Sequence, residues 1–374
     1  MESFVVSARK YRPLGFAEVV GQEHITTTLK NAIDNNHLAQ ALLFCGPRGV
    51  GKTTCARILA RMINNFDTES GDADSSNFNI YELDAASNNS VDDIRNLIDQ
   101  VRYPPQQGKF KVYIIDEVHM LSTQAFNAFL KTLEEPPAYA IFILATTEKH
   151  KVIPTILSRC QIYDFNRIEV GDIVVQLKKI AQKEGIEAEE DALHLIAQKA
   201  DGALRDALSI FDLIVTFSSD NRITYQNTIS NLHILDYDYY FKMCDHFLNE
   251  DISSGLLLFD EILRKGFDGH NFINGLQSHF RNLMVCKDPS TLTLLDVSET
   301  VQKKYQEQAQ SLSTGFLLSG LNLLSQSDLS FKSSKNQRLH VELALMKLTH
   351  LNQALQLASL PSTADPTGVK KKVT

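Results

Sequence analysis

The segment Gly46–Thr53 constrains the fold and chemistry of this chain more than any other. It reads GPRGVGKT, which matches the pattern GxxxxGK[ST]. Glycines let backbone N–H groups approach a phosphate, and the N-terminus of a following helix attracts anions. An apolar run precedes the segment and a helical pattern follows it, as a P-loop requires. We predict a phosphate-binding loop formed by Gly46, Pro47, Arg48, Gly49, Val50, Gly51, Lys52, Thr53 and Thr54.

Two residues of the loop have defined chemical roles in such sites. Lys52 is expected to reach the β- and γ-phosphates of a nucleotide, and Thr53 to ligate Mg²⁺ through its hydroxyl. A chance glycine-rich turn would not have this strand and helix on its two sides. A degenerate site that binds nucleotide without turnover is the more serious alternative.

A pair of carboxylates, Asp116 and Glu117, ends the apolar run VYIID. Adjacent carboxylates at the end of a buried strand are costly unless a metal and water lie beside them. We expect Asp116 to hold Mg²⁺ and Glu117 to orient and activate an attacking water, which makes the site hydrolytic. The alternative for Glu117 alone is an acidic residue that begins a helix.

Four short apolar runs alternate with helical patterns in the first part of the chain: 41–45, 78–83, 110–116 and 140–145. The runs that begin at Ala41, Lys111 and Ala140 are apolar on both faces, which is typical of central strands in a covered parallel sheet. The sequence therefore predicts an α/β P-loop domain over residues 1–167.

Helical patterns replace strands after this domain. Three short amphipathic segments separated by glycines predict a small helical domain over residues 168–227. Apolar residues recur at helical spacing from 228 to 360, which predicts a third, all-helical domain. Residues 361–374, rich in Pro, Thr and Lys, are expected to be a disordered tail.

The composition limits the function further. The chain has 374 residues, 43% of them hydrophobic, and a net charge of −8, which fits a soluble protein of two or three domains. An acidic chain does not coat nucleic acid by bulk charge, so DNA contact requires a local patch. The five cysteines are scattered, which favours buried thiols in the cytoplasm. We expect no membrane span, because no apolar stretch reaches 18 residues.

Several long strings resemble the AAA+ ATPases, and in detail the bacterial clamp-loader subunits of the DNA polymerase III gamma/tau family. They are ARKYRPLGFAEVVGQEH, GPRGVGKTT, ELDAASNNSVDDIR, KVYIIDEVHMLS, AFLKTLEEPP, LATTEKHKVIPTILSRCQ and GALRDALS. The resemblance reaches to about Leu355. It implies a RecA-like AAA+ domain, a helical lid and an oligomerisation collar, and an ATP- and Mg²⁺-dependent motor that loads a sliding clamp onto primed DNA.

The resemblance also assigns roles that spacing alone leaves open. It implies that Thr146 is the sensor-1 residue and that Arg205 is the sensor-2 arginine, acting in cis. Arg159 corresponds to an arginine finger that acts in trans on a neighbour's ATP. From spacing alone, Arg159, Arg205 and the pair Lys149 and Lys151 are equal candidates for the catalytic cation. The adenine and ribose contacts would come from Ala8, Tyr11, Arg12, Pro13 and Val20.

Partners and DNA contacts also follow from the resemblance. Arg95, Thr155 and Asn88 match positions that contact DNA phosphates, although the alternative for Arg95 is a solvated helix face. The implied partners are the delta and delta-prime subunits, further gamma/tau copies, the clamp, primed DNA and, through accessory subunits, single-strand-binding protein. Polymerisation itself is not expected on this chain, so a polymerase label would belong to the holoenzyme.

The sequence departs from the family in two places. Family members carry four zinc-binding cysteines between the P-loop helix and the next strand, but residues 65–77 contain none, and Asn65 stands where the first ligand is expected. We expect no zinc and a flexible, exposed loop there. The chain also ends soon after the third domain, which implies the short gamma form or a shortened tau.

Two other functions remain as alternatives. A non-hydrolysing scaffold subunit would keep SRC but lose a working P-loop, whereas this chain has both. A different AAA+ motor, of the branch-migration or initiator type, would be expected to carry a DNA-binding winged helix near its C-terminus. Residues 237–360 instead read as plain amphipathic helices.

Overall fold

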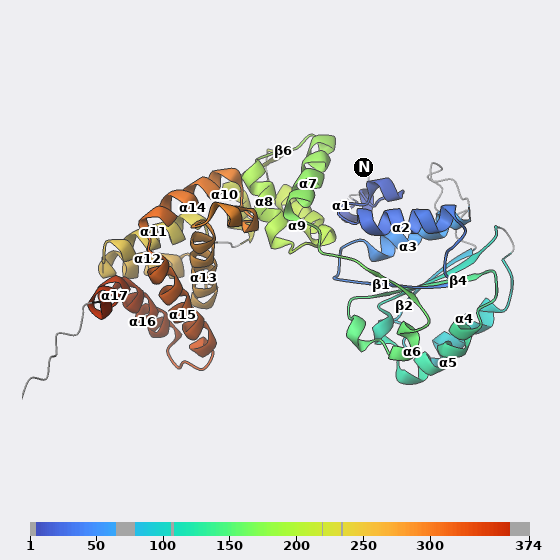
Figure 1. The fold of residues 1–374 in the computed structure, drawn as a ribbon. Helices are drawn as coiled ribbons and strands as arrows, with labels where there is room; N and C mark the ends of the chain where they lie inside the picture. Colours follow the sequence, from blue (N-terminus) through green and yellow to red (C-terminus); the bar gives the residue numbers. More distant parts are fainter. Residues whose placement is uncertain (1–4, 65–78, 106–107, 219, 233–234, 360–374) are drawn as a thin grey trace, which may run out of the picture. The chain divides into compact units, whose positions relative to one another are not determined.

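The computed structural model describes residues 5–64, 79–105, 108–218, 220–232 and 235–359. The chain divides into two compact units, Met1–Thr228 and Ile229–Thr374 (Figure 1). In the described parts, no helix is both long and apolar enough to cross a membrane.

A five-stranded parallel sheet forms the centre of the first unit. Its strands are ordered β2-β3-β4-β1-β5, with each adjacent pair parallel. Strands β1, β3 and β4 lie inside the sheet and are almost wholly buried, as their unbroken apolar character predicts. The predicted α/β class is confirmed. The strands are β1 (Ala41–Cys45), β2 (Ile80–Asp84), β3 (Lys111–Asp116), β4 (Ala140–Thr146) and β5 (Gln161–Asp164).

Helices cover both faces of this sheet (Figure 1). Successive strand residues point to opposite faces, so Leu42 and Phe44 pack with α2 and α3, whereas Leu43 packs with α4 and α5. The first face carries α2 (Glu23–Asp34) and α3 (Lys52–Ile63), and the second carries α4 (Val91–Val101), α5 (Thr123–Glu134) and the short α6 (Pro154–Leu157). Because the strands are parallel, their carboxyl ends all lie at one edge of the sheet, which is where P-loop sites form.

After the sheet, the first unit continues mainly as helices. These are α7 (Val170–Glu184), α8 (Glu190–Lys199) and α9 (Leu204–Phe217), which we call the lid helices, and the two-residue strands β6 (Glu187–Ala188) and β7 (Arg222–Ile223) lie between and after them. Helix α10 (Tyr225–Leu232) contains the boundary between the two units, which falls after Thr228. Gly185 ends α7 in the left-handed conformation, with φ of 67°, as expected for a helix C-terminus. The predicted three helices are present, and the β6–β7 pair is an addition.

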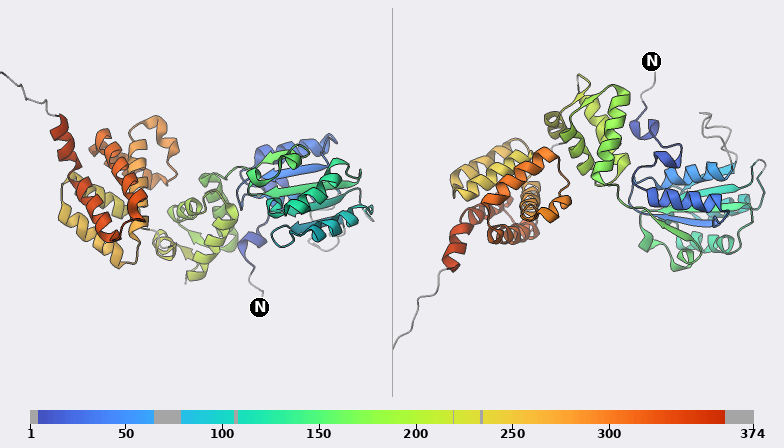
Figure 2. Two further views of the ribbon diagram at one scale, coloured as in Figure 1. Left: turned by 90° about the horizontal axis from the view of Figure 1, so that it is seen from below. Right: turned by 45° about the horizontal axis from the view of Figure 1, so that its top comes forward.

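The second unit contains only helices among its described residues (Figure 2). Its core is formed mainly by aromatic and leucine side chains, and it includes the buried Phe259, Phe272, Phe280 and Phe316. His279 is also buried there, where its ring meets the Tyr305 hydroxyl at 3.0 Å and Gln308 Oε1 at 3.1 Å. The helices are α11 (Tyr237–Leu248), α12 (Ile252–Arg264), α13 (Gly269–Val285), α14 (Glu299–Ser311), α15 (Thr314–Phe331), α16 (Gln337–Thr349) and α17 (Leu351–Ser359).

Candidate nucleotide site

A cavity of about 500 Å³ opens at the carboxyl edge of the sheet in the first unit. Five parts of the chain form its walls: the P-loop, the segment before α2, the ends of β2 and β3, the segment between β5 and α7, and the start of α9. The lining residues are Ala8, Tyr11, Arg12, Pro13, Val19, Val20, Arg48, Gly49, Val50, Gly51, Lys52, Thr53, Thr54, Asp84, Ala86, Asp116, Glu117, Ile168, Leu204, Arg205 and Leu208.

The P-loop connects β1 to α3 and depends on glycine at specific positions. Gly46 has φ of 145°, and a Cβ atom there would lie 2.4 Å from the Phe165 carbonyl oxygen. Gly51 precedes α3 with φ of 105°. Both conformations are strained for residues with a side chain. The loop therefore places its backbone N–H groups at the helix N-terminus, where an anion binds.

The Lys52 side chain lies within the loop, and the residue is 6% exposed. Its Nζ donates to the carbonyl oxygens of Gly46 and Pro47, each at 2.7 Å. Burial lowers the pKa of Lys52, and the nearby carboxylates of Glu117 and Asp116 oppose that shift. The ammonium is thus positioned beside the loop that would hold a triphosphate.

Thr53 and Asp116 meet directly, although they are far apart in the sequence. The Thr53 hydroxyl donates to Asp116 Oδ2 at 2.7 Å, and the other oxygen of Asp116 accepts the N–H of Glu117 at 2.9 Å. The described residues contain no cluster of three or more His, Cys, Asp or Glu side chains able to hold a metal. One hydroxyl and one carboxylate suit Mg²⁺, which keeps several waters and phosphate oxygens as ligands, so this pair fits that ion.

Glu117 has an unusual backbone and a partner that the sequence did not suggest. Its φ of 46° and ψ of 45° are left-handed, which is uncommon for a residue other than glycine. Its Oε2 accepts from both the N–H of Thr147 at 3.2 Å and the hydroxyl of Thr147 at 2.9 Å. The signal that could have found this pair is the position of Thr147, just after strand β4, which is the neighbour of β3.

Thr146 is buried at the end of β4, next to Thr147, and does not line the cavity. Its hydroxyl oxygen accepts the N–H of Glu148 at 3.0 Å and lies 3.0 Å from His119 Nδ1. The same ring nitrogen of His119 is 3.4 Å from Glu117 Oε2. His119 is therefore a second residue of the site that sequence reasoning missed, and it bridges Thr146 and Glu117.

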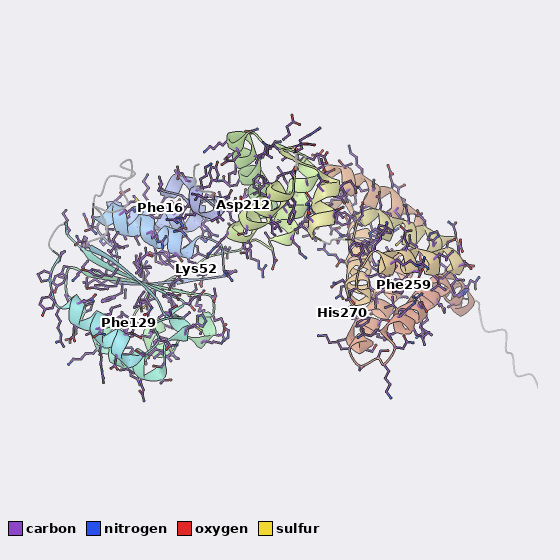
Figure 3. All side chains as sticks on the ribbon, turned by 180° about the vertical axis from the view of Figure 1, so that it is seen from behind. Phe16, Lys52, Phe129, Asp212, Phe259 and His270 are labelled. Carbon is purple, nitrogen blue, oxygen red and sulfur yellow. The ribbon has the colours of Figure 1, made fainter. Side chains whose placement is uncertain are left out.

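The residues predicted to contact adenine and ribose all line the cavity, as does Arg205. Arg205 is also close to the P-loop, because its N–H donates to the Gly49 carbonyl oxygen at 3.3 Å. Figure 3 labels Lys52 in the α/β part and Asp212 further along the helix of Arg205. The structure thus collects the P-loop, the carboxylates and Arg205 around one cavity.

Arg159 lies outside the cavity of its own chain. Its Nη2 contacts Glu134 Oε1 at 2.5 Å, and its Nη1 donates to the Thr155 carbonyl oxygen at 2.7 Å. The two lysine alternatives form other ion pairs: Lys149 with Asp164 at 2.9 Å, and Lys151 with Glu148, three positions earlier in the sequence, at 2.5 Å.

The three proposed DNA contacts lie outside the cavity lining. Arg95 is exposed on α4 and pairs with Asp92 at 3.3 Å. Asn88 precedes α4 and donates to the Asp84 carbonyl oxygen at 3.1 Å, while Thr155 lies on α6. The segment predicted to lack zinc, 65–77 with Asn65, lies outside the described residues.

A parallel five-stranded sheet with a P-loop at its carboxyl edge and helices after it defines a P-loop nucleotide-binding protein of the AAA+ class. Three family models match in sequence order. They are "DNA polymerase III, delta subunit" over residues 21–169, "DNA polymerase III clamp loader subunit, ATPase lid domain" over 172–220 and "DNA polymerase III subunits gamma and tau domain III" over 223–360.

Curated proteins match along most of the chain. DNA polymerase III subunit tau of Bacillus subtilis is 38% identical over 92% of this chain and 63% of its own length. The subunit gamma of Buchnera aphidicola is 33% identical over 94% of this chain and 98% of its own length. The chain therefore belongs to the DNA polymerase III gamma/tau subunit family, and the predicted resemblance is confirmed. The chain spans 43–63% of the length of the tau proteins that it matches.

Solved structures show weaker likenesses. The Thermotoga maritima RuvB Holliday junction branch migration motor has a TM-score of 0.47 and 21% identity, covering 64% of this chain and 79% of that chain. The Bacillus subtilis DNA clamp loader delta protein has a TM-score of 0.38 and 16% identity, covering 86% and 99%. The family assignment rests on the sequence matches alone.

Proposed function

We propose that this chain is an ATP-hydrolysing motor subunit of a clamp loader, which loads a sliding clamp onto primed DNA. One observation carries the hydrolytic part of the proposal: the Thr53 hydroxyl contacts the Asp116 carboxylate at 2.7 Å, with Glu117 next to it, in the same cavity as Lys52. This arrangement provides a metal site, a base and a phosphate-binding cation together. The clamp-loading part is supported by the family match.

The residues of the cavity have complementary tasks. The P-loop N–H groups and Lys52 bind the triphosphate. To do so, the Lys52 ammonium replaces its hydrogen bonds to the loop carbonyl oxygens with hydrogen bonds to phosphate oxygens. Thr53 and Asp116 would hold Mg²⁺, which would supply charge stabilisation on the phosphate oxygens when bound. Glu117 orients a water and accepts its proton, and Thr147 holds the Glu117 carboxylate in place.

Two arginines would complete the site. Arg205 reads the γ-phosphate from the start of α9, which lies against the P-loop in the same chain. Arg159 acts on the nucleotide of a neighbouring subunit, which its position outside its own cavity supports. Loss of the γ-phosphate removes both contacts, and the change is passed to the lid and to the neighbour.

The partners are proposed from the family. They are the delta and delta-prime subunits, further copies of gamma/tau, the clamp, primed DNA and, through accessory subunits, single-strand-binding protein, and the complex would act in the cytoplasm. Arg95, Thr155 and Asn88 would contact the DNA backbone. Thr146 would act as the polar sensor through His119 and Glu117.

A non-hydrolysing scaffold is the alternative in which the cavity binds nucleotide but does not turn it over. The Thr53–Asp116 contact and the placement of Glu117 favour hydrolysis over nucleotide binding without turnover. A branch-migration or initiator motor is disfavoured because the gamma/tau domain III model covers residues 223–360.

Substitution of Glu117 by Gln tests the proposal. Gln keeps the shape of the side chain but cannot accept the proton, so the variant should bind Mg-ATP as the wild type does. Its hydrolysis in the assembled complex should fall about 100-fold or more. Lys52→Ala should instead lose nucleotide binding. Wild-type turnover by Glu117→Gln, or undiminished Mg-ATP affinity in Lys52→Ala, would contradict the proposal.

A further inference from the structure

Residues Val5–Pro13, here called the N-terminal arm, include four of the residues that line the cavity. The arm is attached to the lid helices. Its Ser7 is buried, and the Ser7 N–H donates to Asp212 Oδ2 on α9 at 2.7 Å. The Ser7 hydroxyl donates to the other oxygen of the same carboxylate. The short helix α1 (Ser7–Lys10) packs on α9 as a result.

A second carboxylate, Glu184 at the end of α7, holds the other end of α1. Lys10 Nζ lies 2.5 Å from Glu184 Oε1, and the Tyr11 hydroxyl donates to the same oxygen. The hydrogen bonds from Lys10 and Tyr11 lower the pKa of Glu184. The Lys183 ammonium lies 5.9 Å from the centre of the Tyr11 ring. Within the described residues, the hydrogen bonds that the arm makes to other segments all go to α7 and α9.

The spacing along α9 explains how one helix serves both the cavity and the arm. Arg205, Leu208 and Asp212 are related as i, i+3 and i+7, so they lie on one face of the helix. Arg205 and Leu208 line the cavity, and Asp212 holds Ser7 one turn further along. Arg205 and the arm are therefore carried by the same rigid helix.

The chain returns to the α/β core just after the arm. Val19 packs in the core with Ile25 of α2, whereas Leu14 is 51% exposed and Gly15 has no other atoms near its Cβ position. Behind the arm, a second cavity of about 680 Å³ lies between the arm, residues 17–23 and α7. The arm thus has its hydrogen-bonded support from the lid. Residues 14–15 connect it to the core, and their contacts are local, because the Leu14 N–H donates to Glu18 Oε2 at 2.8 Å and the Gly15 carbonyl oxygen accepts the Glu18 N–H at 3.1 Å.

We propose that the arm and the lid helices move as one body, and that Asp212 and Glu184 are positioning residues for nucleotide binding. A bound nucleotide would contact the P-loop of the core through its phosphates, and the arm through its base and ribose. Closure of the lid would then bring Arg205 and the arm to the nucleotide together. The inference rests on the proposed ATP site and adds how its base-side wall is held.

The test compares two ligands that use different walls of the cavity. Full-length wild type, Asp212→Ala, Glu184→Ala and the double variant are titrated calorimetrically with Mg-ATP and with Mg-tripolyphosphate. Tripolyphosphate has no base or ribose and needs only the P-loop, the metal ligands and Arg205. Glu190→Ala is the matched control, because Glu190 forms an exposed lid ion pair with Lys178 and does not touch the arm.

The double variant should bind Mg-ATP about 10-fold more weakly and bind Mg-tripolyphosphate within about 2-fold of wild type, because only the base-side wall loses its preorganisation. Each single variant should show a smaller loss of the same kind, and Glu190→Ala should show none. Unchanged Mg-ATP affinity, or equal losses for both ligands, would overturn the inference. Ser7→Ala provides a milder check should Asp212→Ala not fold. Wild type that fails to bind Mg-ATP would refute the proposed function instead.

Discussion

Glu117 and Thr147 are joined by two hydrogen bonds: Glu117 Oε2 accepts the N–H of Thr147 at 3.2 Å and its hydroxyl at 2.9 Å. The two residues follow neighbouring strands of the sheet, β3 and β4. A base that must meet a water in one geometry depends on such support, because a loosely held carboxylate samples unproductive orientations.

Substitution of Thr147 by Val tests this support. Valine keeps the backbone N–H and nearly the volume but removes the hydroxyl. We expect turnover in the assembled complex to fall about 10-fold while Mg-ATP affinity stays unchanged, because only the orientation of Glu117 is affected. Thr123→Val serves as control, since Thr123 begins α5 and does not line the cavity. Faster turnover by Thr147→Val would show that Thr147 restrains Glu117 instead.

The position of Arg159 predicts a separation of binding from hydrolysis. Because its guanidinium contacts Glu134 and Thr155 outside the cavity, isolated Arg159→Ala should bind Mg-ATP with wild-type affinity. In the assembled complex its hydrolysis rate should fall about 10³-fold, which is typical of a lost arginine finger. Both quantities are measured by calorimetry and phosphate release.

Arg102→Ala is the control for that experiment, since Arg102 is an exposed arginine paired with Asp99 on the same domain. It should leave binding and turnover as in wild type. Full hydrolysis by Arg159→Ala complexes would disprove the assignment in trans, and weaker ATP binding by the isolated variant would point to a role in cis.

His279 makes the stability of the second unit pH-dependent. Burial lowers the pKa of His279 from the ordinary value of 6.5 to about 3. Between these two pH values the ring is therefore neutral in the folded unit but protonated in the unfolded chain. Titration of His279 costs no stability well above pH 6.5. As the pH falls from 6.5 toward 3, the free energy of unfolding decreases, because only the unfolded chain binds the proton. Between pH 7.5 and 5.5 the free energy of unfolding should fall by about 1.4 kcal/mol from this residue.

Pulse proteolysis in urea can report the unfolding of this unit at the two pH values. His279→Gln removes the titrating group. Between pH 7.5 and 5.5, its free energy of unfolding should therefore fall by about 1.4 kcal/mol less than that of wild type. The overall stability of the variant is expected to be lower at both pH values, because the two hydrogen bonds of the buried His279 ring change. An identical pH dependence in wild type and His279→Gln would contradict the account.

The sequence predicted the local features of the first unit well. Strands β1, β3 and β4 follow from unbroken apolar runs, and the P-loop and Asp116–Glu117 from residues next to one another in the chain. Two-residue strands such as β6 and β7 have too few positions to show periodicity.

Contacts between distant side chains were not predictable. Ser7 and Asp212 are separated by 205 positions, and nothing local marks either as a partner of the other. Thr146 and Thr147 are adjacent and chemically identical. Thr146 contacts His119 and Thr147 contacts Glu117 only because their side chains point in different directions at the end of β4, which the sequence does not reveal. The catalytic role of Thr146 stays a prediction.

The most direct test of the central claim is the ATP hydrolysis rate of the assembled complex with no addition, with clamp, with primed DNA and with both. A clamp-loading motor should be strongly stimulated only when clamp and primed DNA are present together, because hydrolysis then follows formation of the loaded state. A rate that is the same in all four conditions, or no hydrolysis in any of them, would contradict the account.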